Sequence, residues 1–197
     1  MNIAVFASHG GSDLQAIIDG CKTQQVDATV CAVISNNSDA TALQRARKEG
    51  IDSYHISNKM IADPIELDAQ ILKILDAHHT DIIFLAGYLK KLGVDVLHKY
   101  KNRIFNIHPA LLPKYGGKGM YGMNVHNAVI KANEQVSGVT VHRVTEEYDA
   151  GEIVAQTTVN VLKIDTPESL SERILKCEHT FLIAVIKEII DGKIDIS

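Results

Sequence analysis

The sequence contains few cysteines, and their arrangement does not suggest cross-linking. Cys21, Cys31 and Cys177 are odd in number, widely spaced and embedded in apolar runs. Disulfide frameworks and zinc knuckles need cysteines that are paired or closely spaced. The pattern therefore excludes a disulfide-stabilised module and a cysteine-based zinc site, and it predicts three buried free thiols.

Long apolar runs and an excess of positive charge are also missing. No apolar stretch approaches the roughly 18 residues that a membrane-spanning helix needs, and the residues before Gly10 lack the charged-then-apolar plan of a signal peptide. The 20 Lys and Arg residues are outnumbered by 24 Asp and Glu residues, which gives a formal charge of −4. A basic surface for a nucleic-acid backbone is therefore not expected. These absences predict a cytoplasmic protein whose partners include neither a membrane nor a nucleic acid.

The composition that remains is that of an ordinary globular domain. Apolar residues make up 46% of the 197 residues and charged residues 22%, which excludes a disordered, collagen-like or coiled-coil chain. A chain of this length buries roughly 70% of the surface that its unfolded form exposes. No internal repeat, low-complexity tract or long linker divides it. We therefore expect a single domain over residues 1–197.

Short β-branched runs alternate with segments of helical spacing. The expected strands are 2–7, 28–35, 51–56, 81–86 and 103–108, and the helices between them are expected to begin near Leu14, Ala40, Pro64 and Gly93. Later come a helix over 125–132, two β-rich segments, 138–144 and 153–162, and a last helix whose apolar stripe includes Ile174, Cys177 and Phe181. The alternation predicts a Rossmann-like α/β fold: a mostly parallel twisted sheet, helices on both faces, and antiparallel strands toward the C-terminal half.

The first turn, Gly10-Gly11-Ser12-Asp13, follows an expected strand and precedes a helix. Backbone N–H groups at a helix N-terminus, together with the helix dipole, favour an anion such as a phosphate. The dinucleotide pattern G-x-G-x-x-G is absent, and the second expected strand ends in Ser35-Asn36-Asn37 without an acidic residue to hold a ribose. The alternative is an ordinary tight turn in which Ser12 or Asp13 caps the helix.

Asn106 and His108 lie two residues apart at the end of an expected strand. The period of two places both side chains on one face, and Pro109 favours extended geometry at His108. Ligands of parallel sheets bind beyond the carboxyl ends of the strands. An amide donor beside an imidazole suits the stabilisation of negative charge on a carbonyl oxygen while a proton moves. The alternative is a hydrogen-bonded histidine that terminates a strand.

The acidic loop 146–152 has the composition of a hairpin connection between the two late β-rich segments. It contains Asp149, followed by a glycine that allows the backbone to bend closely around a ligand. A carboxylate brought near His108 would orient the imidazole ring and favour its charged form. The alternative is a solvated run of charge without a ligand.

Four blocks of the sequence carry a resemblance to a known family. They are 11–17, 86–88, 106–113, and 138–142 together with 149–151. These blocks resemble the phosphoribosylglycinamide formyltransferases, the folate-dependent enzymes of purine synthesis, over essentially the whole chain. The N-x-H-P-[SA]-L-L-P block followed by D-x-G is specific to folate-dependent formyl transfer, and the G-S-D-L-Q turn indicates the glycinamide ribonucleotide enzymes within that group.

The resemblance implies transfer of the formyl group of 10-formyltetrahydrofolate to the amine of glycinamide ribonucleotide, with these two small molecules as partners and no metal. It implies a nucleotide- and phosphate-binding half, 1–105, and a catalytic and folate-binding half, 106–197; a monomer and a homodimer both stay open. The implied catalytic residues are Asn106, His108 and Asp149. The implied ribonucleotide-binding residues are Gly11, Ser12, Asp13 and Glu178. The implied folate-binding residues are Leu89, Lys90, Lys91, Leu92, Thr145, Glu146, Glu147 and Tyr148, with Asn106 and Asp149.

The sequence departs from the family's usual pattern in two places, and three other functions share parts of that pattern. Asp13 stands where the family more usually has Asn, and the glycine-rich segment 115–122 is longer than in many members, so that it is either a lid over the formyl site or merely a longer loop. With water as the acceptor the same catalytic residues would make a formyltetrahydrofolate deformylase, which the phosphate turn disfavours. A decayed site would leave a non-catalytic folate- or nucleotide-binding module. Methionyl-tRNA formyltransferases share the N-x-H-P block but add a nucleic-acid-binding domain, for which no basic tail is seen here.

Overall fold

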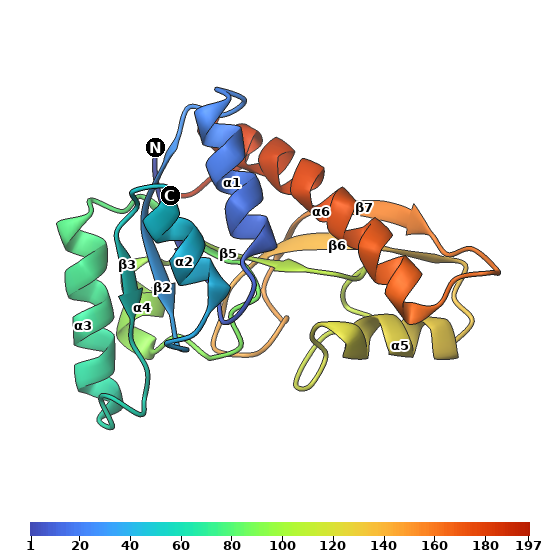
Figure 1. The fold of residues 1–197 in the computed structure, drawn as a ribbon, viewed down its shortest axis with the longest axis horizontal. Coiled ribbons are helices and arrows are strands. Elements are labelled where there is room, and N and C mark those ends of the chain that lie inside the picture. Colours follow the sequence, from blue (N-terminus) through green and yellow to red (C-terminus); the bar gives the residue numbers. More distant parts are fainter.

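One sheet of seven strands runs through the molecule in the order β3-β2-β1-β4-β5-β6-β7 (Figure 1). The computed structural model describes all residues, Met1–Ser197. The strands are β1 (Asn2–Phe6), β2 (Thr29–Ser35), β3 (Ser53–His55), β4 (Ile82–Leu85), β5 (Ile104–His108), β6 (Val136–Arg143) and β7 (Ile153–Asn160). Neighbours from β3 to β5 are parallel, whereas β6 is antiparallel to both β5 and β7. The expected mostly parallel sheet with antiparallel strands in the C-terminal half is confirmed.

Helices cover both faces of this sheet. They are α1 (Ser12–Lys22), α2 (Thr41–Lys48), α3 (Pro64–Ala77), α4 (Val94–Lys99), α5 (Met123–Lys131) and α6 (Pro167–Ile190). The larger hydrophobic cluster joins one face of the sheet to α1, α2, α5 and α6, and the smaller cluster joins the other face to α3 and α4. Figure 1 shows the long α6 passing over β6 and β7 toward α1. None of the helices is both long and apolar enough to cross a membrane.

The central strands are apolar because both of their faces are covered. All four residues of β4 are buried, and so is every residue of β1 after Asn2. Side chains alternate between the two clusters: Ile3 and Val5 belong to the larger one, Ala4 and Phe6 to the smaller one. Complete burial of one large apolar side chain stabilises the fold by about 1.5–3 kcal/mol. This core holds the carboxyl ends of β1, β4 and β5 in fixed positions.

The strand order reverses at β1, which lies between β2 and β4. In sheets of this kind the reversal leaves a crevice beyond the carboxyl ends of the strands. Here the loops after β1 and β4 are tied together: the Ser8 N–H donates to the Gly87 carbonyl oxygen at 3.1 Å, and the Ser8 Oγ accepts from the Leu89 N–H at 2.8 Å. The crevice therefore has a rigid floor.

The N-terminus of helix α1 has a glycine as its N-cap residue. Gly11 is the N-cap with a left-handed φ of 70°, and no side-chain hydrogen bond caps the helix. A Cβ at Gly11 would lie 2.8 Å from the Ala42 Cβ, so the turn packs directly against α2. The alternative in which Ser12 or Asp13 caps the helix is wrong.

Two predictions of burial need correction. The cysteines are free, as expected, but each is only half-buried, because they pack at the rims of the two hydrophobic clusters. On α6, Cys177 and Phe181 are also half-buried, and the positions that complete the buried stripe are Glu178 and Leu182. A carboxyl group therefore occupies a core-facing position of the last helix.

Candidate functional site

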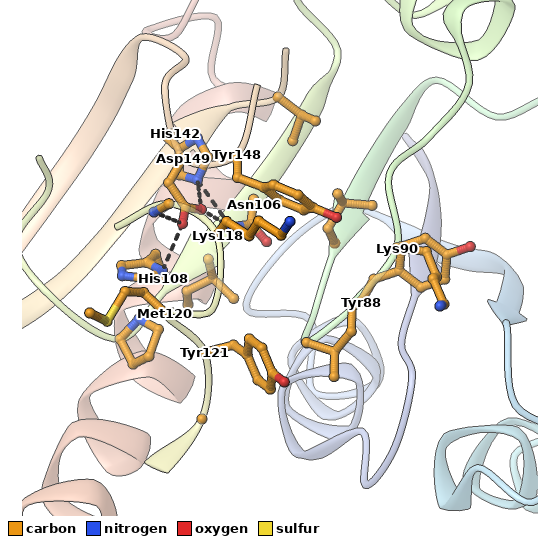
Figure 2. Close-up of a pocket in the computed structure, with 18 of the residues that line it drawn as sticks. Tyr88, Lys90, Asn106, His108, Lys118, Met120, Tyr121, His142, Tyr148 and Asp149 are labelled. Atoms are coloured by element: carbon orange, nitrogen blue, oxygen red, sulfur yellow. Dashed lines mark hydrogen bonds and ion pairs between the residues drawn. The ribbon is translucent and has the colours of Figure 1, made fainter. Parts of the chain in front are cut away.

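A cavity of about 440 Å³ opens beyond the carboxyl ends of β1, β4 and β5. Its walls come from segments far apart in the sequence: the start of α1, the loops after β4 and β6, residues 117–122, and one face of α6. In Figure 2, Asn106, His108, His142 and Asp149 form a connected group, and Tyr88 and Lys90 lie in another part of the pocket. Every site residue expected from the sequence lines this cavity except Gly11, which lies at the N-cap of α1.

Asn106 and His108 project from β5 into this cavity, as the period of two predicts. Asp149 comes from the loop after β6 and lies between His108 and His142 (Figure 2). The Asn106 Nδ2 donates to the Asp149 Oδ1 at 3.5 Å, and the His108 Nδ1 lies 3.8 Å from the Asp149 Oδ2. The three side chains expected to act together are therefore within reach of one small ligand group.

Asp149 is held as a carboxylate. Its φ of 54° is left-handed, and behind it Gly151 lies so close to the Arg143 carbonyl group that a Cβ at this glycine would overlap it. The Gly117 N–H donates to the Asp149 Oδ2 at 2.8 Å. Burial alone would raise the pKa of Asp149, but the close contact with His142, the hydrogen bond from the Gly117 N–H and the charges of the neighbouring histidines together hold the pKa below its ordinary value.

The ring of His108 is oriented by the main chain. Its Nε2 donates to the Tyr115 carbonyl oxygen at 2.8 Å, so Nε2 carries a hydrogen and Nδ1 faces Asp149. Burial lowers the pKa of His108, and neither the charge of Asp149 nor the hydrogen bond to Tyr115 compensates for it. The charge of Asp149 favours the charged form of His108, as expected, but desolvation exceeds this attraction across 3.8 Å, so the pKa of the ring lies below its ordinary value.

His142 belongs to this group, although the sequence analysis above assigns it no role. The pairing of β5 with β6 places it opposite Asn106. Its Nδ1 donates to the Arg143 carbonyl oxygen at 2.8 Å, which leaves Nε2 to accept from the Asn106 Nδ2 at 3.0 Å. The same Nε2 lies 3.4 Å from the Asp149 Oδ1. The only signal in the sequence was that His142 belongs to block 138–142, one of the blocks that resemble the family. The strand register that places His142 beside Asn106 cannot be read from the sequence.

The start of α1 meets α6 at another part of the cavity. Ser12 and Asp13 line it together with Glu178, whose residue surface is only 7% exposed. Burial raises the pKa of Asp13 to about 6, against the opposing charge of His179. Burial and the nearby Asp13 raise the pKa of Glu178 well above its ordinary value. The helix N-terminus suits an anion, whereas the two carboxyl groups oppose one unless they are protonated.

The loops after β4 and β6 contribute a third part of the lining. Leu85, Leu92 and Val144 supply apolar surface. The two loops also touch each other, since the Lys91 Nζ lies 5.0 Å from the centroid of the Tyr148 ring. Burial and the negative charge of Asp68 raise the pKa of Tyr88 to about 12, so its hydroxyl group stays protonated. The remaining lining residues of these loops include Lys90, Thr145, Glu146 and Glu147.

Residues 117–122 of the glycine-rich segment 115–122 form a wall of the cavity, and the main chain of the segment contacts His108 and Asp149. The Tyr115 carbonyl oxygen accepts from His108, and the Gly117 N–H donates to Asp149. Gly117, Gly119 and Gly122 have φ values of 91°, 90° and 53°, a region that favours glycine. The composition of the segment therefore follows from its backbone, and its role as a lid stays a prediction.

A further histidine, His126 of α5, also lines the cavity and was not singled out in the sequence. It is 4% exposed, and its Nδ1 is buried without a hydrogen-bond partner. Burial and the charge of His108 lower the pKa of His126. The structure contains no group of three or more His, Cys, Asp or Glu side chains arranged to hold a metal ion.

Known proteins of one family match this chain over nearly its whole length. The family description "Formyl transferase" matches residues 1–186. The chain is 39% identical to the chloroplastic phosphoribosylglycinamide formyltransferase of Arabidopsis thaliana, with 98% of this chain and 66% of that protein covered. It is 36% identical to the phosphoribosylglycinamide formyltransferase of Escherichia coli, with 98% and 89% covered. The chain thus spans slightly less than two thirds of the plant relative and most of the bacterial one.

Solved structures share the fold. Glycinamide ribonucleotide transformylase 1 of Symbiobacterium toebii superposes with a TM-score of 0.91 at 36% identity, covering 100% of this chain and 91% of that chain. A formyltetrahydrofolate deformylase from Pseudomonas syringae superposes with a TM-score of 0.83 at 23% identity, covering 97% of this chain and 61% of that chain. At this lower identity, the likeness to the deformylase concerns the fold alone.

Proposed function

Because the chain belongs to the formyl transferase family, we propose that it transfers the formyl group of 10-formyltetrahydrofolate to the amine of glycinamide ribonucleotide, giving formylglycinamide ribonucleotide for purine synthesis. The observation that carries this proposal is the composition of the cavity. It joins an oxyanion-type group, formed by Asn106, His108 and Asp149, to an uncapped helix N-terminus beside Ser12. Two substrates can therefore meet there, one of them bearing a phosphate group.

The lining fits a flat heteroaromatic donor such as a folate. Leu85, Leu92 and Val144 offer apolar surface, and the loops after β4 and β6 add main-chain and charged groups beside it. The donor supplies the formyl group, and the chain binds and orients it. We assign this binding to residues 89–92 and 145–149 together with Asn106.

The ribonucleotide is assigned to the start of α1 and the facing side of α6. Gly11 and Ser12 present the helix N-terminus to the phosphate group, since no side chain caps this helix. Glu178 lies buried in the same wall, where its carboxyl group can hydrogen-bond to a hydroxyl group of the substrate.

The reaction forms one bond and breaks another. The amine nitrogen attacks the formyl carbon, the bond from that carbon to the folate nitrogen breaks, and one proton passes from the amine to the folate nitrogen. Negative charge develops on the formyl oxygen, which we place beside Asn106 and His108. One hydrogen of the Asn106 amide is held by His142 at 3.0 Å, while the other makes only a 3.5 Å contact with Asp149 and can turn to this oxygen.

His108 begins neutral and is the group that holds the travelling proton. His108 lines the cavity and its Nδ1 faces Asp149, so a proton released by the amine can reach this nitrogen through a bound water. The imidazolium ion then lies between the Asp149 carboxylate and the developing charge of the formyl oxygen, both of which stabilise it. Asp149 therefore supports a transient charge on His108 and does not maintain a permanent one.

A coupled assay tests the proposal. The protein is mixed with glycinamide ribonucleotide and 10-formyltetrahydrofolate, and loss of the formyl group is followed with each component omitted in turn. We expect tetrahydrofolate and formylglycinamide ribonucleotide in equal amounts, and only when both substrates are present. Release of formate without the ribonucleotide would assign the chain to the deformylases. Binding of both molecules without turnover would assign it to the non-catalytic modules.

We propose that the protein acts in the cytoplasm, as a monomer or a homodimer, on these two small molecules and not on nucleic acid or membranes. The division into halves 1–105 and 106–197 is also a proposal. Residues of both halves line the same cavity: Asp13 of the first half lies with Glu178 of the second, and Lys91 of the first half lies over Tyr148 of the second.

A further inference from the structure

Two carboxyl groups and one imidazole form a cluster where α1 meets α6. Asp13 belongs to the first turn of α1, and Glu178 and His179 are neighbours on α6. The Asp13 side chain is 13% exposed, and Glu178 as a residue is 7% exposed. Both carboxyl-bearing residues line the cavity. This cluster has no part in the chemistry assigned to Asn106, His108 and Asp149.

The cluster is poorly neutralised. The Asp13 Oδ1 and the His179 Nε2 lie 3.6 Å apart, and each is buried without a hydrogen-bond partner. Arg45 of α2 points elsewhere, with its guanidinium group bonded to the Gly10 carbonyl oxygen and to the Gln15 side chain. His179 is therefore the basic side chain that contacts Asp13. Ionising both acids in this dry site is costly, and this cost is what raises the pKa of Asp13 to about 6 and that of Glu178 well above its ordinary value.

An anion placed at the start of α1 would lie next to the cluster. The uncapped N–H groups and the dipole of α1 attract a phosphate group, whereas two carboxylates repel it. A protonated Asp13 reverses its contribution, because it then offers an O–H donor to the same phosphate oxygens, and a protonated Glu178 no longer repels them.

We propose that Asp13 and Glu178 are a proton-holding unit of the substrate site, so that a phosphomonoester substrate binds together with at least one proton. This inference rests on the proposed function, since it takes the phosphate group of glycinamide ribonucleotide as the anion. The proton comes from solvent and returns to it when the product leaves, so it takes no part in the balance of formyl transfer. Asp13 is the member of the unit that sets how strongly affinity depends on pH.

Proton uptake fixes both the direction and the size of the change of KM with pH. When one proton is taken up on binding, the KM for the ribonucleotide rises by up to about tenfold for each pH unit above the titration of the unit. Asp13→Asn keeps the shape of the side chain and removes its charge, so we expect its KM to rise less steeply with pH. At pH 8 the variant should bind the ribonucleotide more tightly than the wild type. The matched control is Asp19→Asn, which removes one charge from an exposed position of the same helix.

The test measures KM and kcat from pH 6 to pH 8.5 for the wild type and both variants, with calorimetric titration of glycinamide ribonucleotide in two buffers of different ionisation enthalpy to count protons. We expect an uptake of about one proton for the wild type and for Asp19→Asn, and a smaller uptake for Asp13→Asn. Equal proton numbers and parallel KM profiles in the wild type and Asp13→Asn would overturn the inference. If Asp13→Asn does not fold by circular dichroism, Glu178→Gln takes its place under the same criterion. Absence of wild-type turnover at every pH would instead refute the proposed function.

Discussion

Asp149 is the residue that connects the proposed catalytic group, because it contacts Asn106, His142 and the Gly117 N–H and lies near His108. It is a fixed charge beside a neutral ring, and this arrangement allows the ring to gain a proton during the reaction. The contributions of Asn106 and His108, which lie beside Asp149, can be measured separately by substitution.

Removal of either group assigned to the formyl oxygen should slow the chemical step. Loss of one oxyanion donor costs about 10²- to 10³-fold in rate in other enzymes, so we expect kcat to fall by at least about 10²-fold in His108→Ala and in Asn106→Ala. Steady-state kinetics at saturating substrates, with circular dichroism as the check on folding, provides the measurement. A variant that keeps more than a tenth of the wild-type kcat would contradict its assigned role.

The pH dependence of kcat reports the starting state of His108. A neutral ring is required at the outset, so kcat should fall as pH decreases through the pKa of His108, which burial places below its ordinary value. The charge of Asp149 raises that pKa, so its loss in Asp149→Asn should move the acid limb to still lower pH as well as reduce kcat. Saturating ribonucleotide keeps the cluster at α1 out of this measurement. An acid limb that stays in place, or moves to higher pH, would contradict the neutral starting state.

Among the elements, β5 and the glycine-rich segment were predicted with unequal success. The end of β5 could be predicted because Asn106, His108 and Pro109 combine a period of two with extended geometry. The main-chain contacts of Tyr115 and Gly117 could not be predicted, since they depend on how segment 115–122 folds back over β5. His142 was missed for a related reason, because the register of β6 against β5 is set by packing across the sheet.

Segment 115–122 provides a prediction at this scale. Gly117 and Gly119 have nearly equal φ values of 91° and 90°, and a Cβ at either position meets open space, but only the Gly117 N–H binds Asp149. Alanine at either position forces a left-handed residue, at a cost of about 1–2 kcal/mol. Gly117→Ala should therefore lower kcat about tenfold, whereas Gly119→Ala should leave it within about twofold at a similar loss of thermal stability. Equal kcat values in the two variants would mean that the bond to Asp149 does not position the carboxylate.

At the scale of the whole molecule, the fold class was accessible from the alternation of strands and helices, whereas the lining of the cavity was accessible only through the resemblance to a family. Asp13 and Glu178 come from the first and last helices, and no local pattern indicates that they meet. Helical periodicity placed Cys177 on the buried face of the last helix, whereas the structure places Glu178 there, because the period of a helix fixes the spacing of its buried positions but not their phase.

Arg143 joins three distant parts of the chain. Its guanidinium group donates to the Asn102 and Asp195 carbonyl oxygens and pairs with Glu152. Arg143→Ala removes these bonds from a side chain that is 15% exposed, and we expect a loss of about 2 kcal/mol, or roughly 4–8 °C in Tm. Arg47→Ala, at an exposed position of α2, serves as the control and should change stability by less than about 0.5 kcal/mol. Thermal unfolding of both variants makes the comparison, and equal Tm values would show that the C-terminal tail is not anchored by Arg143.

The bonds between segment 115–122 and the side chains of His108 and Asp149 involve a carbonyl oxygen and an amide hydrogen of the backbone, and no side chain of the segment takes part in them. Substitution of Lys118, Met120 or Tyr121 therefore removes none of the groups that form these two bonds. Because all three residues line the cavity, such substitutions alter its shape and charge while both main-chain partners of His108 and Asp149 remain in the sequence.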